Sequence, residues 1–141
     1  MIEAIRTFNR YYARVLGVFN NKYLDADFSP TEVRLIGEIG RTPGVTAKQI
    51  AAYLFLDKSY LSRVIRKLTG AGIIQRQRSE SDGRAMPLFL TEKGLALHEE
   101  LDARANARIE GQIQGLSEAQ KQVLVNAMDQ IRNILSDAVQ I

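Results

Sequence analysis

The fold is decided by residues 46–68, which read TAKQIAAYLFLDKSYLSRVIRKL. The first four letters, TAKQ, form a capping box that opens a short helix, predicted over 46–54. Asp57 caps a longer helix, predicted over 58–68. Two short helices joined by a turn of about three residues are typical of a helix-turn-helix.

The second helix has one apolar face and one polar face. The apolar face forms a shared seam with the first helix, made of Ala51, Leu54, Leu56, Leu61, Val64, Ile65 and Leu68. The polar residues recur at helical spacing, so they share one exposed face. They are Lys58, Ser59, Ser62, Arg63 and Arg66. Small hydroxyl groups flanked by arginine suit the major groove of DNA, because arginine donates two hydrogen bonds to guanine and also reaches phosphates.

A β-hairpin is predicted directly after the second helix. Residues 73–78 alternate apolar and polar side chains as a strand does, and a return strand follows over 86–90. The loop between them, 79–85, contains an Asp-Gly pair that is typical of hairpin turns. Pro87 predicts that the return strand lies at a sheet edge.

The hairpin is basic, with Arg76 and Arg78 on its first strand and Arg84 near its tip. A short hairpin beside a recognition helix is a wing, and an arginine at its tip suits a narrow minor groove. Asp82 is placed to hold Arg84 by a charge-assisted hydrogen bond. The hairpin therefore predicts a second DNA contact beside the helix.

Further helices are predicted on both sides of this core. Residues 2–21 carry apolar side chains at spacings of three and four, and the letters SPTE at 29–32 form a second capping box. Two more helices are predicted, one from Thr91 to about 114 and one from Ser117 onward. The fold class is therefore mainly α with a small β-hairpin wing.

The whole chain, 1–141, is predicted to form one domain. The winged helix-turn-helix covers about 29–91, and the flanking helices cover about 2–22 and 92–139. These flanking helices are longer and more apolar than one winged domain needs, so we expect them to pack against a second copy in a two-fold dimer. Such a dimer places two recognition helices ~34 Å apart, which predicts a pseudo-palindromic DNA operator.

Charge is unevenly distributed along the chain. Residues 41–84 hold nine Lys or Arg against three Asp or Glu, whereas the remainder holds ten against thirteen. A basic island of this kind favours a polyanionic partner such as nucleic acid. The chain has no cysteine, no apolar run long enough for a membrane span, and no signal-peptide core in residues 1–10. We therefore expect a cytoplasmic, nucleoid-associated protein without disulfides or a membrane partner.

Five motifs in this order resemble the DNA-binding core of MarR-type transcription regulators. They are FSPTE at 28–32, TAKQIA at 46–51, DKSYLSR at 57–63, SDGR at 81–84 and LTEKG at 90–94. The resemblance extends over nearly the whole chain, because the helices before and after supply the family's dimerisation layer. It implies a transcription regulator that binds specific double-stranded DNA as a homodimer.

The resemblance also implies roles for individual residues. The face toward the major groove is Ser59, Ser62, Arg63 and Arg66, next to Lys58 and Tyr60. Asp82 and Arg84 form the wing-tip pair, while Thr46 and Lys48 touch phosphates. Tyr60 is larger than the residue that the family often has there, and Ala85 stands where a further basic residue is frequent.

The N-terminal helix carries a more particular resemblance. Its letters IEAIRTFNRYY, at 2–12, resemble the start of MarR-like domains fused to a GNAT-type acetyltransferase. An acetyltransferase domain would need about 150 further residues, so only the regulator half is carried over. Tyr11 and Tyr12, like Phe8 and Phe19, suit the dimer core, and the alternative is a family-type effector pocket, between the dimerisation helices and the winged domain, that would use Tyr11 or Tyr12. A ligand there would bias the dimer between two geometries, and the sequence does not name that ligand.

Other function classes find little support. The sequence has no glycine-rich phosphate loop and no nucleophile with a neighbouring base, so we predict neither an enzyme nor a cofactor. His98 is the only histidine, and Glu99 and Glu100 point to other faces of its helix, so no metal site is predicted.

Two alternatives stay open from the sequence. The first is a protein-interaction adaptor that keeps the fold and has lost DNA binding, which the intact Arg63 and Arg84 argue against. The second concerns Lys48, Arg76 and Arg78, for which a solvated surface charge is the alternative to a DNA contact.

Overall fold

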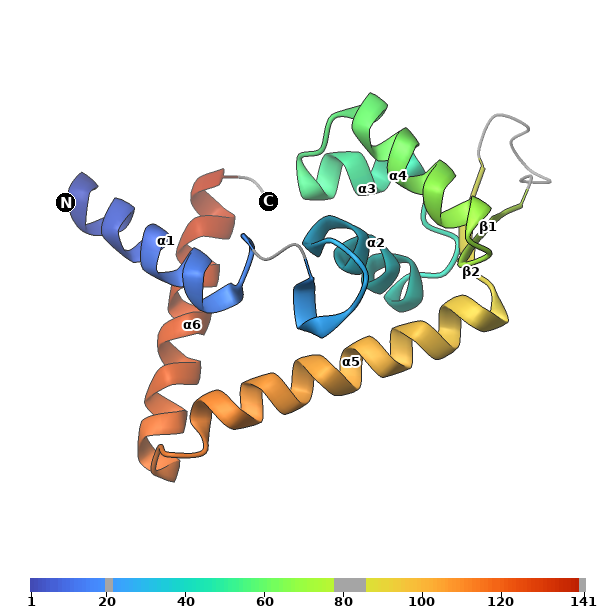
Figure 1. The fold of residues 1–141 in the computed structure, drawn as a ribbon. Coiled ribbons are helices and arrows are strands. Elements are labelled where there is room, and N and C mark those ends of the chain that lie inside the picture. The colour runs from blue at the N-terminus through green and yellow to red at the C-terminus, as the bar shows by residue number, and fades with distance from the viewer. Residues whose placement is uncertain (20–21, 78–85, 140–141) are drawn as a thin grey trace. The chain divides into compact units, whose positions relative to one another are not determined.

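Helices dominate the structure, a computed structural model that describes residues 1–19, 22–77 and 86–139 (Figure 1). The chain divides into two compact units, Met1–Asp102 and Ala103–Ile141. The mainly α fold with a β-hairpin that the sequence predicts is confirmed. The elements are α1 (Ile2–Leu16), a 3-10 turn η1 (Tyr23–Asp25), α2 (Pro30–Arg41), α3 (Ala47–Leu54), α4 (Lys58–Gly70), β1 (Ile74–Arg76), β2 (Leu88–Leu90), α5 (Glu92–Ile113) and α6 (Glu118–Val139).

Helix α1 ends earlier than the apolar pattern predicts. We expected a helix over 2–21, but Gly17 adopts a left-handed conformation with φ 72° and ψ 28°. Its N–H donates to the carbonyl groups of Ala13 and Arg14, and Val18 N–H donates to Ala13 O. Glycine reaches this conformation without a steric penalty, so it terminates the helix although apolar residues follow it.

The core lies where α2, α3, α4 and the hairpin meet (Figure 1). Helix α4 contributes four buried side chains at helical spacing, which are Leu61, Val64, Ile65 and Leu68. Helix α2 packs opposite them, and the side chains of Leu35, Ile36 and Ile39 are fully buried there. Of the predicted seam, Leu54 and Leu56 are only half-buried at the edge of this core. This packing fixes the orientation of α4 and leaves its opposite face to solvent.

Helix starts follow the predicted caps with one difference. The Thr46–Gln49 capping box is complete, because each residue's side chain accepts a hydrogen bond from the other's backbone N–H. Ser29 caps α2 by accepting from Glu32 N–H at 3.2 Å. The second half of that predicted box is wrong: the Glu32 carboxylate binds Lys67 Nζ at 2.8 Å instead. A buried carboxylate gains more from a cation than from one further backbone N–H.

The hairpin pairs β1 with β2 in antiparallel register, with Ile74 opposite Leu90 and Arg76 opposite Leu88. The chain before α3 extends the pairing on the other side of β2, where Leu88 N–H donates to Val45 O at 2.9 Å. Pro87 precedes β2, and its carbonyl accepts from Gln77 N–H. The predicted loop, 79–85, lies outside the described residues.

Helix α5 begins in close contact with the hairpin. The Thr91 hydroxyl caps it by accepting from Gly94 N–H at 3.0 Å, and Thr91 N–H donates to Ile73 O. Gly94 is buried, and a Cβ built on it would lie 2.2 Å from Ile73 O. The helix therefore approaches the hairpin backbone more closely than any larger residue permits.

The first and last helices carry apolar side chains that the chain itself leaves exposed. On α1 these include Ile2 and Ile5, which are 76% and 58% exposed. On α6 no residue with a described side chain is buried, although Val123, Ile131, Ile134 and Leu135 are all large and apolar. Within the described part of the chain, no helix combines the length and apolar character that a membrane crossing needs.

Candidate nucleic-acid interface

The predicted recognition face is assembled on α4. Asp57 caps the helix by accepting from Tyr60 N–H at 3.0 Å, which fixes its start where the sequence predicts it. Because Leu61, Ile65 and Leu68 face the core, the opposite face carries only exposed residues. That face holds Lys58, Ser59, Ser62, Arg63 and Arg66. The structure thus brings together the five residues of the predicted polar face.

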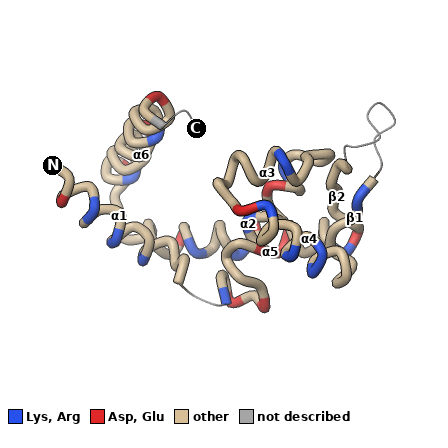
Figure 2. The backbone as a smooth tube through the Cα atoms, turned by 90° about the horizontal axis from the view of Figure 1, so that it is seen from above, with Lys and Arg blue, Asp and Glu red and all other residues tan. Residues whose placement is uncertain are grey.

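Among the described residues, most basic residues on α3, α4 and β1 have no carboxylate partner, and Lys67 is the exception. In the described part of the chain, five of them make no ion pair with a carboxylate. They are Lys48, Lys58, Arg63, Arg66 and Arg76. Arg10, Arg34 and Lys121, by contrast, are each paired with a glutamate. Figure 2 shows basic segments on α3, α4 and β1. Because carboxylates do not neutralise these cations on adjoining elements, the region attracts a polyanion.

Tyr60 contacts the arginine that lies one turn further along α4. The guanidinium carbon of Arg63 lies 5.9 Å from the centre of the Tyr60 ring, within the range of a cation–π interaction. The ring thereby restricts where this guanidinium group points without neutralising its charge. Tyr60 is itself 38% exposed and belongs to the same surface.

Helix α3 presents the predicted phosphate contacts at its N-terminus. Thr46 is half-buried, and its hydroxyl oxygen accepts from Gln49 N–H at 3.2 Å. The hydroxyl hydrogen stays available to donate to an anion. Lys48 is exposed in the first turn of the same helix.

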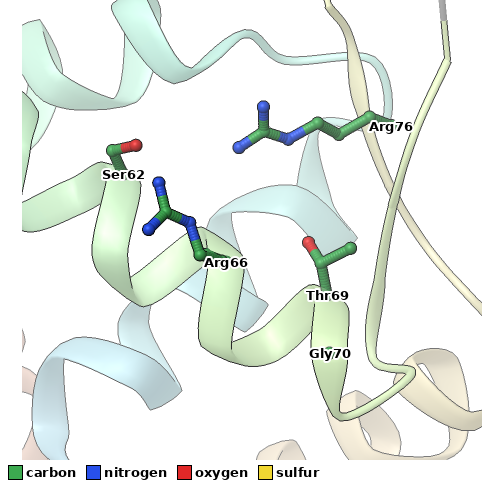
Figure 3. A pocket seen from close by; sticks show the side chains of 5 residues that line it. All are labelled: Ser62, Arg66, Thr69, Gly70 and Arg76. Atoms are coloured by element: carbon green, nitrogen blue, oxygen red, sulfur yellow. The ribbon is translucent and has the colours of Figure 1, made fainter.

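A hollow of about 410 Å³ opens between α4 and β1. It is lined by Ser62, Arg66, Thr69, Gly70 and Arg76. Figure 3 shows the guanidinium groups of Arg66 and Arg76 extending over the same space, on the side where the Ser62 hydroxyl lies. We expected Arg66 in the major groove and Arg76 on the wing, and the structure brings both to one hollow. Thr69 and Gly70 were not predicted, although Thr69 follows Ser62 and Arg66 at helical spacing.

Lys67 has a different role from the other cations of α4. Its Nζ lies 2.8 Å from Oε1 of Glu32, a residue of α2 that is only 8% exposed. The other carboxylate oxygen of Glu32 is buried without a hydrogen-bond partner among the described residues. This pair ties α4 to α2 and holds the recognition helix in place. It joins residues 35 positions apart, so no local sequence signal could have indicated it.

Several predicted site residues lie elsewhere. Arg78, Asp82 and Arg84 fall outside the described residues, so the wing-tip contact stays a prediction. Tyr11 and Tyr12 lie on α1, where the Tyr12 ring stacks on Phe8 with ring centres 5.5 Å apart and Tyr11 contacts Arg14.

The single histidine lies away from this interface. His98 is on α5, with Nε2 at 3.6 Å from Asp102, and its ring packs on Gly40. In the described ranges, no three His, Asp or Glu side chains gather as metal ligands would. His98 therefore belongs to the contact between α5 and α2.

Comparison with known proteins relates this chain to one family. The family model described as "MarR family" matches residues 26–85, which hold α2, α3, α4 and β1. The structure matches that of FabT from Streptococcus pneumoniae in complex with DNA, with a TM-score of 0.81 and 27% identity, over 98% of this chain and 99% of FabT. Residues 26–85 of the chain therefore match the MarR family. The order of helices and hairpin is that of a winged helix-turn-helix.

Other proteins similar to this chain agree with that match. It is 34% identical over 83 residues to the HTH-type transcriptional regulator PetP of Rhodobacter capsulatus, which covers 59% of the chain and 50% of PetP. The chain thus spans about half the length of this relative. A MarR family regulator from Listeria monocytogenes, complexed with a 26mer DNA, shares the fold with a TM-score of 0.76 at 19% identity, over 95% of this chain and 89% of that chain. PetP and the Listeria monocytogenes protein are both transcriptional regulators by name.

Proposed function

We propose that this chain is a sequence-specific transcription regulator that binds double-stranded DNA as a homodimer. The observation that carries the proposal is the set of cations without carboxylate partners on α3, α4 and β1, in the described part of the chain. Phosphate contacts supply much of the affinity of any DNA-binding protein. FabT, which shares the fold over nearly its whole length, was solved in complex with DNA.

Roles within the interface follow from position on the recognition helix. In a helix-turn-helix, residues near the N-terminus of the second helix contact base edges. Ser59, Ser62 and Arg63 occupy that part of α4, with Tyr60 and Lys58 beside them. Thr46 and Lys48, at the start of α3, contact phosphates. Arg78, Asp82 and Arg84 complete the interface from the wing.

The dimer is supported by the apolar faces of α1 and α6. Large apolar side chains such as Ile2, Ile5 and Ile134 are more than half exposed in the single chain. Such a surface is expected to be covered in a soluble protein, and a second copy covers both faces by two-fold symmetry. The predicted operator is accordingly pseudo-palindromic, with half-sites about one DNA turn apart.

Two further properties complete the proposal. A protein that reads genomic DNA acts in the cytoplasm, at the nucleoid. An effector would bias the dimer between geometries with different wing spacing, and Tyr11 or Tyr12 would contact it on α1.

Binding to genomic fragments, including the one upstream of the chain's own gene, tests the proposal. We expect tight binding to a few fragments, and affinity that falls about a thousandfold or more between 50 and 200 mM salt, as for six or more phosphate contacts. Random duplex of the same length is the control. Weak binding that is equal on all sequences would contradict the proposal and favour the adaptor alternative.

Arg63→Ala is expected to reduce sequence discrimination. Arg63 is exposed near the centre of the recognition face, so its loss removes a bidentate base contact worth about 1–3 kcal/mol, or roughly 5- to 150-fold in affinity. The ratio of affinities for operator and random duplex measures this effect. Arg34→Ala is the matched control, because Arg34 is paired with Glu38 on α2. Equal losses on operator and random DNA for Arg63→Ala would contradict the base-reading role.

A further inference from the structure

The hollow between α4 and β1 has an unusual electrostatic composition. Two arginines line it, Arg66 and Arg76, and neither forms an ion pair with a carboxylate in the described ranges. Among the described residues, no Asp or Glu belongs to the lining. Two like charges that share one hollow repel each other, so an anion placed between them is favoured by both. The guanidinium groups extend freely over the space, as Figure 3 shows.

The donors in the hollow suit a tetrahedral oxyanion. Each guanidinium group presents several N–H donors in a planar fork that matches phosphate oxygens. The Ser62 hydroxyl lies at one end of the same space, where the hollow adjoins the base-reading part of α4. Thr69 adds no donor, because its hydroxyl donates to Ile65 O at 2.7 Å. Thr69 therefore shapes the wall of the hollow, and the two arginines provide its donors.

The position of the hollow indicates the source of that phosphate. Its lining runs along α4 from Ser62 to the last residue, Gly70, with Arg66 one turn beyond Ser62, and Arg76 of β1 borders it. The N-terminal part of a recognition helix lies deepest in the major groove, so its later turns emerge at the sugar-phosphate backbone beside the groove. A duplex read by Ser59 and Arg63 would therefore present a backbone phosphate at this hollow.

We infer that Arg66 and Arg76 together hold one phosphate of the DNA backbone in this hollow, which fixes the register of α4 in the major groove. The inference rests on the proposed function and refines it. Arg66 is then a phosphate contact and not a base-reading residue. Arg76, on β1, is part of the same contact and not a separate wing contact.

Gly70 forms part of the hollow and leaves it open. It is the last residue of α4, and a Cβ built on it would meet no atom within 4 Å. A side chain at this position on the wall of the hollow therefore has room and does not disturb the core. Gly70→Glu would place a carboxylate beside the two guanidinium groups, where it competes with the phosphate. Gly70→Gln has the same shape without the charge and serves as its matched control.

A double-mutant cycle on operator DNA tests whether the two arginines share one partner. We expect Arg66→Ala and Arg76→Ala each to weaken binding about tenfold on operator and random duplex alike. Each is expected to reduce the slope of log affinity against log salt by about 0.9. The double variant should lose little more than either single one. Lys48→Ala, on α3, serves as the control in a second cycle with Arg66→Ala. In that double variant the two losses of affinity should multiply.

Operators that carry one uncharged methylphosphonate at a time locate the phosphate itself. Wild-type protein should lose affinity when the methylphosphonate replaces one particular phosphate in each half-site. The Arg66→Ala and Arg76→Ala variants should not lose affinity further at that position. Gly70→Glu should weaken binding more than Gly70→Gln, with unchanged thermal stability for both. The inference would be overturned if the methylphosphonate scan were the same for wild type and for both arginine variants. It would also be overturned if the affinity losses of Arg66→Ala and Arg76→Ala multiplied in the double variant.

A free anion is the alternative occupant of this hollow, and a separate titration distinguishes that case. Calorimetry with inorganic phosphate, at ionic strength matched by chloride, should show no binding that depends on Arg66 and Arg76. Such binding together with a flat methylphosphonate scan would assign the hollow to a free anion and overturn the DNA assignment. Failure of the proposed function looks different, because the wild-type protein would then show no preferred duplex at all.

Discussion

Ile131→Asp combined with Leu135→Asp is expected to convert the dimer to a monomer and to weaken operator binding about a hundredfold or more. The two side chains lie one turn apart on α6 and are 39% and 50% exposed in the single chain. Carboxylates on this face would be buried against the second copy without partners, which disfavours association. A monomer then binds one half-site at a time and loses the gain from linked binding, which reaches about 10²–10⁴.

Sedimentation and operator titration check this prediction together. Asn133→Asp is the matched control, because it adds a carboxylate to the polar side of the same helix. The double variant should stay folded, because neither side chain is buried within the chain itself. A variant that remains dimeric would place the dimer interface elsewhere. A monomer with unchanged operator affinity would show that DNA binding needs only one copy.

Gly94→Ala is expected to destabilise the fold by about 1–3 kcal/mol, as overpacking of a tight contact does. A Cβ at this position would lie 2.2 Å from Ile73 O and 3.2 Å from Leu90 Cβ. The carbonyl belongs to the backbone that leads into β1 and accepts from Thr91 N–H, so it cannot move without disturbing the start of α5. Urea denaturation measures the loss directly.

Gly111→Ala is the control for the same substitution without a steric conflict. Gly111 lies in the same helix, α5, and a Cβ there meets nothing within 4 Å. Because alanine favours a helix over glycine by up to about 1 kcal/mol, this variant should be as stable as wild type or more stable. Equal stability of the two variants would contradict the close contact between α5 and the hairpin.

The sequence predicts those parts of the molecule that local signals specify. The Thr46–Gln49 capping box and the Asp57 cap set the starts of α3 and α4, and the apolar spacing along α4 identifies its buried side. The exposed face of α4 follows as the remainder of the same pattern. Both kinds of signal act within a few residues, so reading them requires no knowledge of the fold.

Features that depend on tertiary contacts were not predictable in this way. Glu32 has the position of a capping-box acid, yet it turns to Lys67, because burial makes a cation the better partner. The hollow is formed only when α4 packs beside β1, so Arg66 and Arg76 gave no sign of acting together. The early end of α1 had a local signal in Gly17, which the continuing apolar pattern obscured.

The central claim is that two copies of this chain read one DNA site through paired α4 helices. Selection of bound duplexes from a random library, with the purified 141-residue chain, tests it most directly. The account predicts enrichment of an inverted repeat whose half-sites lie about one helical turn apart, with loss of the repeat for Arg63→Ala. Enrichment of no sequence, or of an unrepeated site bound by one chain, would contradict it.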